Sequence, residues 1–189
     1  QGRQDQRRGR RGAGRHRSHF ARCSLSINIP RNQPLIFDTN VAVLFYVGLA
    51  DPDLIRKHQR LDNFDLQDFK LLSEIALNAS SLAISPYVAA EVSNLALDKR
   101  NIGAAARSRI SEVMREHIIQ AAEVFAACAT AAGEEQFGLL GMTDSALLLI
   151  LKNDRKLNLL TDDFRLSQIG QARKLRVFNF SHIRDQRED

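Results

Sequence analysis

The sequence has little cysteine and no long apolar run, and both shortages exclude classes of protein. Its 189 residues include only two cysteines, Cys23 and Cys128, with no Cys-x-x-Cys pair and no two histidines at metal-ligand spacing. This usage predicts neither a disulfide framework nor a structural zinc site, and it is typical of the reducing cytoplasm. Apolar runs such as residues 146–151 are far shorter than the roughly 20 residues that cross a bilayer, so we expect no membrane segment.

Three short motifs of common enzymes are missing as well. The chain contains no Gly-x-Ser-x-Gly, no Gly-x-x-x-x-Gly-Lys-Ser/Thr and no Gly-x-Gly-x-x-Gly. Their absence argues against a nucleophile-elbow hydrolase, a P-loop NTPase and a dinucleotide-binding fold.

The positive charge is concentrated at the start of the chain. The net charge is +5, but residues 1–22 hold eight arginines against one acid, Asp5, so the remainder carries −2. This segment has almost no apolar residues and is expected to be a disordered tail, either an electrostatic arm for RNA or a non-native extension. The rest of the chain is not a basic domain.

From residue 34 onward, short apolar runs alternate with longer helical patterns, which predicts an α/β fold. We expect a three-layer α/β/α sandwich with a central, mainly parallel sheet over residues 34–184, between a tail at 1–33 and a short tail at 185–189. Residues 50–66 are predicted as a loop or short helical insertion, and residues 121–138 are ambiguous. The expected strands are 34–37, 82–85, 157–160 and 175–180; the expected helices are 40–49, 67–79, 86–98, 103–120, 143–153 and 164–172.

Acids follow the expected strands at the places where sites form in parallel sheets. Asp38 follows one strand, and Asp162 and Asp163 follow another. Ser85 and Pro86 are a strong helix start after a third strand, and that helix carries Glu91.

The helical acids Glu91 and Asp144 have different expected environments. Glu91 is expected on the inward stripe formed by Val88, Val92 and Leu95, where a glutamate needs a partner such as a metal ion. Asp144 precedes the apolar helix, and it suits the helix dipole if Thr143 is the N-cap. Clustered carboxylates repel one another, and in proteins this repulsion is usually offset by a bound hard divalent cation such as Mg²⁺ or Mn²⁺.

Four ordered motifs resemble those of the PIN-domain ribonucleases, which include toxins of bacterial toxin–antitoxin pairs. They are LIFDTNV at residues 35–41, SPYVAAEVSNL at 85–95, LLGMTDSALL at 139–148 and LLTDDFRLS at 159–167. The resemblance covers residues 34–184. It implies an α/β/α sandwich and a Mg²⁺- or Mn²⁺-dependent endoribonuclease that hydrolyses RNA, with an antitoxin protein as a further partner. A second copy of the chain is the other partner to consider, and the cysteine usage favours the cytoplasm.

The resemblance assigns roles to individual residues. Asp38, Glu91, Asp144 and Asp163 would hold one or two metal ions for attack of water on a phosphodiester. Asp162 is the second choice for the fourth acid, because the chain has Thr-Asp-Asp where the family commonly has Thr-x-Asp. By the resemblance, Asn40 would orient Asp38. Thr143 and Thr161 could hydrogen-bond the ligands or metal-bound water. We also expect the RNA backbone to contact Arg56, Lys57, Arg60 or Arg165. The alternative is a catalytically silent RNA- or protein-binding module with the same fold; a phosphatase-like use of Asp38 fits less well, because residue 40 is Asn.

Overall fold

The computed structural model describes residues 29–100 and 102–186. The arginine-rich segment 1–22 and residues 187–189 lie outside these ranges, as does Asn101. In the described ranges, no helix combines the length and the hydropathy that are needed to cross a membrane.

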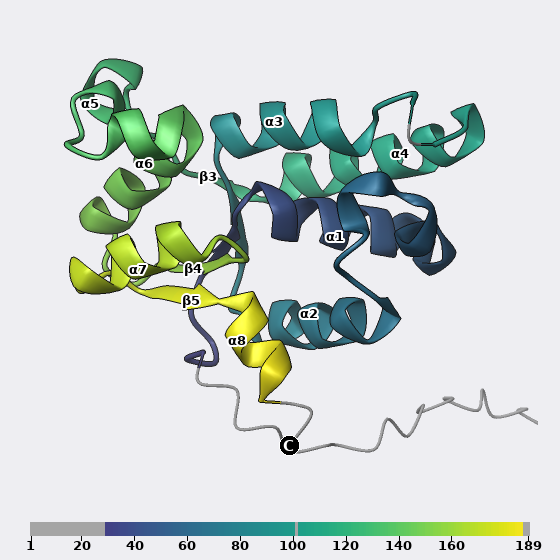
Figure 1. The fold of residues 1–189 in the computed structure, drawn as a ribbon, viewed down its shortest axis with the longest axis horizontal. Helices are drawn as coiled ribbons and strands as arrows, with labels where there is room; N and C mark the ends of the chain where they lie inside the picture. Colours follow the sequence, from purple (N-terminus) through teal and green to yellow (C-terminus); the bar gives the residue numbers. More distant parts are fainter. Residues whose placement is uncertain (1–28, 101, 187–189) are drawn as a thin grey trace, which may run out of the picture.

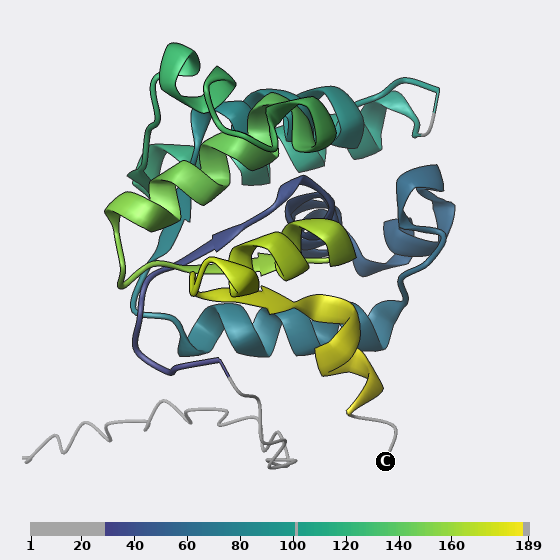
Figure 2. The ribbon, with the colours of Figure 1, turned by 60° about the vertical axis from the view of Figure 1, so that its left-hand side comes forward.

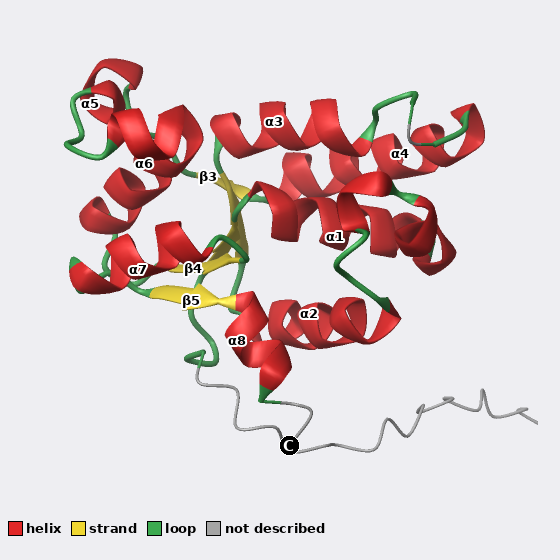
Figure 3. Ribbon diagram, viewed as in Figure 1, coloured by secondary structure: helices red, strands yellow, loops and turns green. Residues whose placement is uncertain are grey.

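The centre of the molecule is a five-stranded parallel sheet (Figure 3). Its strand order is β3-β2-β1-β4-β5, and each pair of neighbours is parallel. The sheet is built from β1 (Leu35–Phe37), β2 (Leu82–Ile84), β3 (Ala122–Glu123), β4 (Asn158–Thr161) and β5 (Val177–Asn179).

Helices cover both faces of this sheet, so the predicted three-layer α/β/α sandwich is confirmed. Figures 1 and 2 show α3, α4 and α6 on one side of the strands and α2 on the other. The helices are α1 (Thr39–Ala50), α2 (Leu66–Asn78), α3 (Pro86–Ala96), α4 (Ala104–Gln120), α5 (Cys128–Ala132), α6 (Phe137–Asn153), α7 (Phe164–Ala172) and α8 (Phe180–Asp185), with 3-10 helices η1 (Pro52–Lys57) and η2 (Gln59–Leu61) between α1 and α2.

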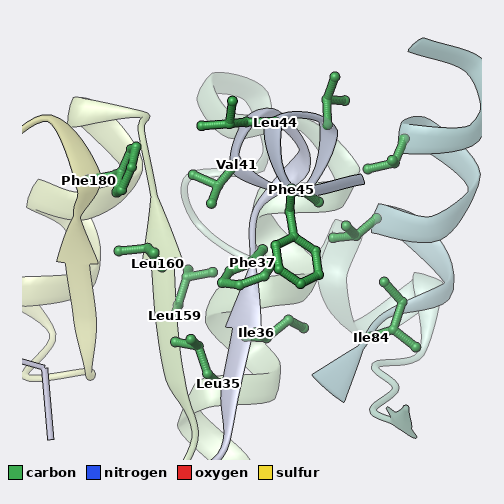
Figure 4. Close-up of a cluster of buried hydrophobic side chains, with 14 of the residues drawn as sticks. Leu35, Ile36, Phe37, Val41, Leu44, Phe45, Ile84, Leu159, Leu160 and Phe180 are labelled. Atoms are coloured by element: carbon green, nitrogen blue, oxygen red, sulfur yellow. The ribbon is translucent and has the colours of Figure 1, made fainter. Parts of the chain in front are cut away.

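The core is centred on β1, because this strand lies between two others and under helices. Its three side chains are at most 5% exposed. Figure 4 shows them beside Leu159 and Leu160 of β4, with Ile84 of β2 on the other flank. Ile36 lies opposite Leu159, and this register places the ends of β1 and β4 side by side.

The ambiguous segment 121–138 contains elements that the pattern did not indicate. The strand β3 has only two residues, both exposed, and the helix α5 has five residues. Neither has the apolar periodicity that identifies a buried strand or an amphipathic helix. The helix α6 also begins at Phe137 instead of residue 143, and it contains a kink at Gly141, where φ is 77°.

Candidate functional site

The acids that follow β1 and β4 meet at the carboxyl edge of the sheet. Asp38 ends β1 and caps the first turn of α1, and Asp163 follows β4 and caps α7. Since β1 and β4 are parallel neighbours, both caps lie at the same edge. Open α/β sheets place their ligand sites at this edge.

Asp38 is held in one orientation by groups on both strands. Its Oδ1 accepts a hydrogen bond from the Val41 N–H at 2.8 Å, and its Oδ2 accepts from the Asp162 N–H at 3.0 Å and from the Thr161 hydroxyl. The residue is only 4% exposed, and this burial raises the pKa of its carboxyl to about 6, although the hydrogen bonds act in the opposite direction.

Thr161 joins two of the predicted acids, whereas Asn40 lies apart from them. The Thr161 hydroxyl donates to Asp38 and accepts from the Asp163 N–H at 2.9 Å. The side chain of Asn40 is exposed on α1, and the hydrogen bonds that orient Asp38 come from other residues. The predicted orientation of Asp38 by Asn40 is therefore not seen.

Glu91 is exposed, so its predicted position in the buried stripe of α3 is wrong. The buried residues of this helix are Val88, Val92 and Ala96, which are four positions apart. Glu91 lies about 100° around the helix from Val92, because each residue turns the chain by that angle. Its Oε2 accepts a hydrogen bond from the Thr39 hydroxyl at 2.7 Å, which places the carboxylate beside the first turn of α1.

Asp144 is close enough to the other three predicted acids for their charges to raise its pKa. It lies three residues after the kink at Gly141, so Thr143 lies inside α6 instead of at its N-cap as predicted. Burial and, to a smaller extent, the charges of Asp38, Asp163 and Glu91 in that order together raise the pKa of Asp144 to about 7. Four carboxyls from four segments of the chain therefore lie within electrostatic reach of one another.

Asp162 and Asp163 have different neighbours. The Asp162 side chain accepts a hydrogen bond from the Ser181 hydroxyl at 2.5 Å, toward α8. Asp163 is exposed, and its Oδ1 accepts from the Leu166 N–H at 2.8 Å. The charge of Asp163 acts on Asp144, whereas the charge of Asp162 acts on Asp38.

This difference predicts the ranking of two substitutions. Asp163→Asn is expected to reduce metal-dependent activity by at least about tenfold more than Asp162→Asn. Both variants should fold, because Asn is as good a helix cap as Asp and still accepts a hydrogen bond. Equal cleavage rates for the two, measured with a labelled RNA, would contradict the assignment, and the reverse ranking would move the site by one residue.

The cations predicted to contact RNA fall into two groups. Arg165 is exposed in the first turn of α7, two residues from Asp163. Arg56, Lys57 and Arg60 are exposed on η1 and η2, which follow the C-terminal end of α1. The twelve residues of α1 span about 18 Å, so these three cations lie at the far end of the helix from Asp38.

Several polar residues at this edge were not predicted. Thr39 binds Glu91, and Ser181 binds Asp162. Ser85 and Ser145 have buried hydroxyls that lack a hydrogen-bond partner among the described residues. Such groups usually bind an ordered water or mark a functional site. Because Ser and Thr are common at helix N-caps, their residue type alone did not indicate a place in the site.

The donor set suits a hard cation, but the side chains do not surround one. Carboxylate oxygens are the ligands that Mg²⁺ and Mn²⁺ prefer. Within residues 29–100 and 102–186, however, no three His, Cys, Asp or Glu side chains are close enough to hold a metal ion as they stand. The Glu91 carboxylate accepts a hydrogen bond from the Thr39 hydroxyl, and the Asp163 carboxylate accepts one from the Leu166 N–H. Both side chains would have to rotate before they could bind a common cation.

Comparisons of the chain with protein-family models, with curated proteins and with solved structures found no match. Any function of the chain must therefore be inferred from the residues and geometry of this edge of the sheet.

Proposed function

We propose that the chain is a Mg²⁺- or Mn²⁺-dependent endoribonuclease of the PIN-domain type. The observation that supports this most strongly is the environment of Asp144, whose pKa is raised by burial and by the charges of Asp38, Asp163 and Glu91. A partly buried cluster of four carboxyls destabilises a fold unless something offsets the repulsion. A divalent cation offsets it, and this cluster has no cationic side chain as a hydrogen-bond or ion-pair partner in the described chain.

Asp38, Glu91, Asp144 and Asp163 would hold the cation, which when bound activates water and neutralises charge on the phosphodiester. The chain's own contribution is orientation. Thr161, with the N–H groups of Val41 and Asp162, fixes both oxygens of Asp38, and Thr39 positions Glu91. Asp38, whose two oxygens are both fixed, needs little rearrangement when the reaction occurs, whereas Glu91 would turn from Thr39 toward the cation.

The exposed Arg165 supports RNA as the substrate, because it lies beside Asp163 where the phosphate backbone would enter. Phe164 is 55% exposed at the same turn, and its ring contacts His182 at 5.9 Å between centroids. An exposed aromatic ring beside a cation is suited to stacking with a base of a single strand.

One observation favours the second candidate, a silent RNA- or protein-binding module. The acids form no ready-made ligand set among the described side chains. A silent module would bind RNA equally well with and without chelator, and it would not cleave it.

The test is cleavage of a labelled single-stranded RNA with Mn²⁺ and with chelator, by the wild-type chain and by Glu91→Gln. Glu91 is exposed, so the substitution removes a charge without disturbing the core. We expect a loss of at least about tenfold in rate. The matched control is Glu112→Gln on the exposed face of α4, which should cleave like wild type. If wild type does not cleave with Mn²⁺, or if both variants are equally active, the four-acid site is refuted.

A further inference from the structure

Two short loops at the opposite edge of the sheet are rich in cations. Residues 152–156 include the end of α6 and most of the loop that leads to β4, and residues 173–176 connect α7 to β5; together they hold six Lys and Arg side chains against one acid, Asp154. Pairing of β4 with β5 brings the loops together, and the Leu159 N–H donates to the Arg176 carbonyl at 2.8 Å. In Figure 2 both loops lie on the left, whereas α7 begins on the right.

The loops border a surface hollow of about 480 Å³. Its lining includes Lys152, Arg155 and Arg173 together with Glu134 and Glu135. Arg173 is already neutralised, because it donates to Glu134 at 2.6 Å and also to Gln136. Five exposed cations remain, and the ion pairs found in the described ranges involve none of them; we call this set the basic rim: Lys152, Arg155, Lys156, Lys174 and Arg176.

One member of the basic rim occupies a backbone conformation that favours glycine. Lys174 has a φ of 57°. It ends α7 in a Schellman motif, in which the Leu175 N–H donates to the Gly170 carbonyl and the Lys174 N–H to the Gln171 carbonyl, both at 2.9 Å. Glycine adopts this conformation without the steric cost that a side chain incurs. Lys174 therefore places a positive charge at this edge of the sheet at a position where the backbone conformation favours glycine.

We propose that the basic rim binds phosphate groups of an RNA strand whose scissile segment lies at the acids. The choice of RNA rests on the proposed function, and the surface supports it independently. Protein interfaces are anchored by large apolar side chains, and none of the large hydrophobic residues that the described chain exposes lies in residues 152–156 or 173–176. Phosphate contacts need only positive charge, which Lys and Arg supply.

The position of the basic rim sets which RNA molecules can reach it. It lies before β4, whereas Asp163 follows β4, and the four residues of this strand span about 13 Å. A strand of RNA must therefore extend at least about 13 Å beyond the acids to contact both places. A short oligonucleotide bound at the acids should not touch the basic rim.

The experiment compares two triple variants of the full chain that lose the same charge. One is Lys156→Gln, Lys174→Gln and Arg176→Gln; the control is Lys70→Gln, Lys99→Gln and Arg115→Gln, three exposed cations elsewhere. Binding of a long unstructured RNA is measured by anisotropy over a range of salt concentrations with chelator. We expect the slope of log K against log salt to fall by about 2 in the first variant, at roughly 0.7 per lost contact. The control should keep the wild-type slope.

The outcomes separate the basic rim from the ribonuclease proposal. An unchanged slope in the first variant, or an equal change in the control, overturns the basic rim even if wild type cleaves a short oligonucleotide. A reduced slope without any cleavage supports the basic rim and refutes the ribonuclease. Binding of polyglutamate that depends on the basic rim while RNA binding does not would identify an acidic protein as the ligand and overturn the proposal.

Lys174→Gly gives a second test that misfolding cannot mimic. It relieves the backbone at φ 57° and removes one cation, so we expect a higher melting temperature together with a weaker salt dependence of RNA binding. Full wild-type RNA binding by this more stable variant would contradict a role for Lys174.

Discussion

Asp144→Asn is expected to abolish Mn²⁺-dependent RNA cleavage, with a loss of at least about a hundredfold, and to make the metal-free protein more stable at pH 8. The substitution keeps the shape of the side chain and removes the charge that burial and three neighbouring acids disfavour. Each unit of pKa shift corresponds to about 1.4 kcal/mol. Screening at this partly exposed side chain reduces that figure, so we expect a gain of roughly 1–2 kcal/mol in the free energy of unfolding.

The sign of this gain depends on pH. The pKa of Asp144 is about 7 in the folded state and near 3.8 when unperturbed. Between these values the folded state binds more protons, so wild type loses stability as the pH rises toward 7. The variant lacks this loss, and the difference in stability should be near zero at pH 4 and largest above pH 7. Comparing the variant with wild type cancels the opposite contribution of the buried His58 and the half-buried His117, whose pKa values are lowered by burial.

Denaturant unfolding at several pH values measures this difference, and Asp53→Asn on the exposed start of η1 is the matched control. The control should show no pH-dependent gain. A verified Asp144→Asn protein that cleaves near the wild-type rate would remove Asp144 from the site, and one that is less stable than wild type at pH 8 would contradict the carboxyl cluster.

Mn²⁺ should raise the melting temperature of the wild-type chain, because the carboxyls converge only in the folded state. At a hundredfold excess over Kd, preferential binding to the folded state adds about 2.7 kcal/mol to the free energy of unfolding. The effect should fade below about pH 6, where protonation of Asp38 and Asp144 removes ligands.

Asp38→Asn should blunt the rise in melting temperature, and Asp154→Asn, in an exposed loop at the opposite edge, should leave it intact. A wild-type melting temperature that is the same with chelator and with millimolar Mn²⁺ would favour the silent module. In that case the short hydrogen-bonded network around Asp38 would be a helix cap only.

The buried parts of the fold could be read from the sequence, because apolar runs identify strands that are covered on both faces. The predicted strand at 82–85 and helix at 164–172 agree with β2 and α7 to within a residue. The exposed strand β3 buries neither of its side chains and therefore left no apolar pattern. The early start of α6 was hidden by Gly141, which looks like a helix end in the sequence but is a kink inside the helix.

The candidate site was predictable in part. The acids after β1 and β4 follow from the rule that parallel strands present their carboxyl ends at one edge. The exposure of Glu91 could not be predicted from the spacing of apolar residues. A buried face centred between Val88, Val92 and Leu95 includes Glu91, whereas the observed buried face, which runs through Val92 and Ala96, excludes it. The hydrogen bonds from Thr39 to Glu91 and from Ser181 to Asp162 could not be predicted, because they join residues 52 and 19 positions apart that meet only in the tertiary structure.

The hydrogen bonds of Asp38 also bear on synthesis of the chain. Its carboxylate joins the start of the domain to Thr161 and Asp162, which lie 123 and 124 positions later. Contacts of such long sequence separation carry a large loop-closure cost and are slow to form. A ribosome-bound chain from which β4 has not emerged has Asp38, Glu91 and Asp144 but neither Thr161 nor Asp163. If the chain is the proposed ribonuclease, it would therefore stay inactive toward the messenger that encodes it until synthesis of the domain is nearly complete.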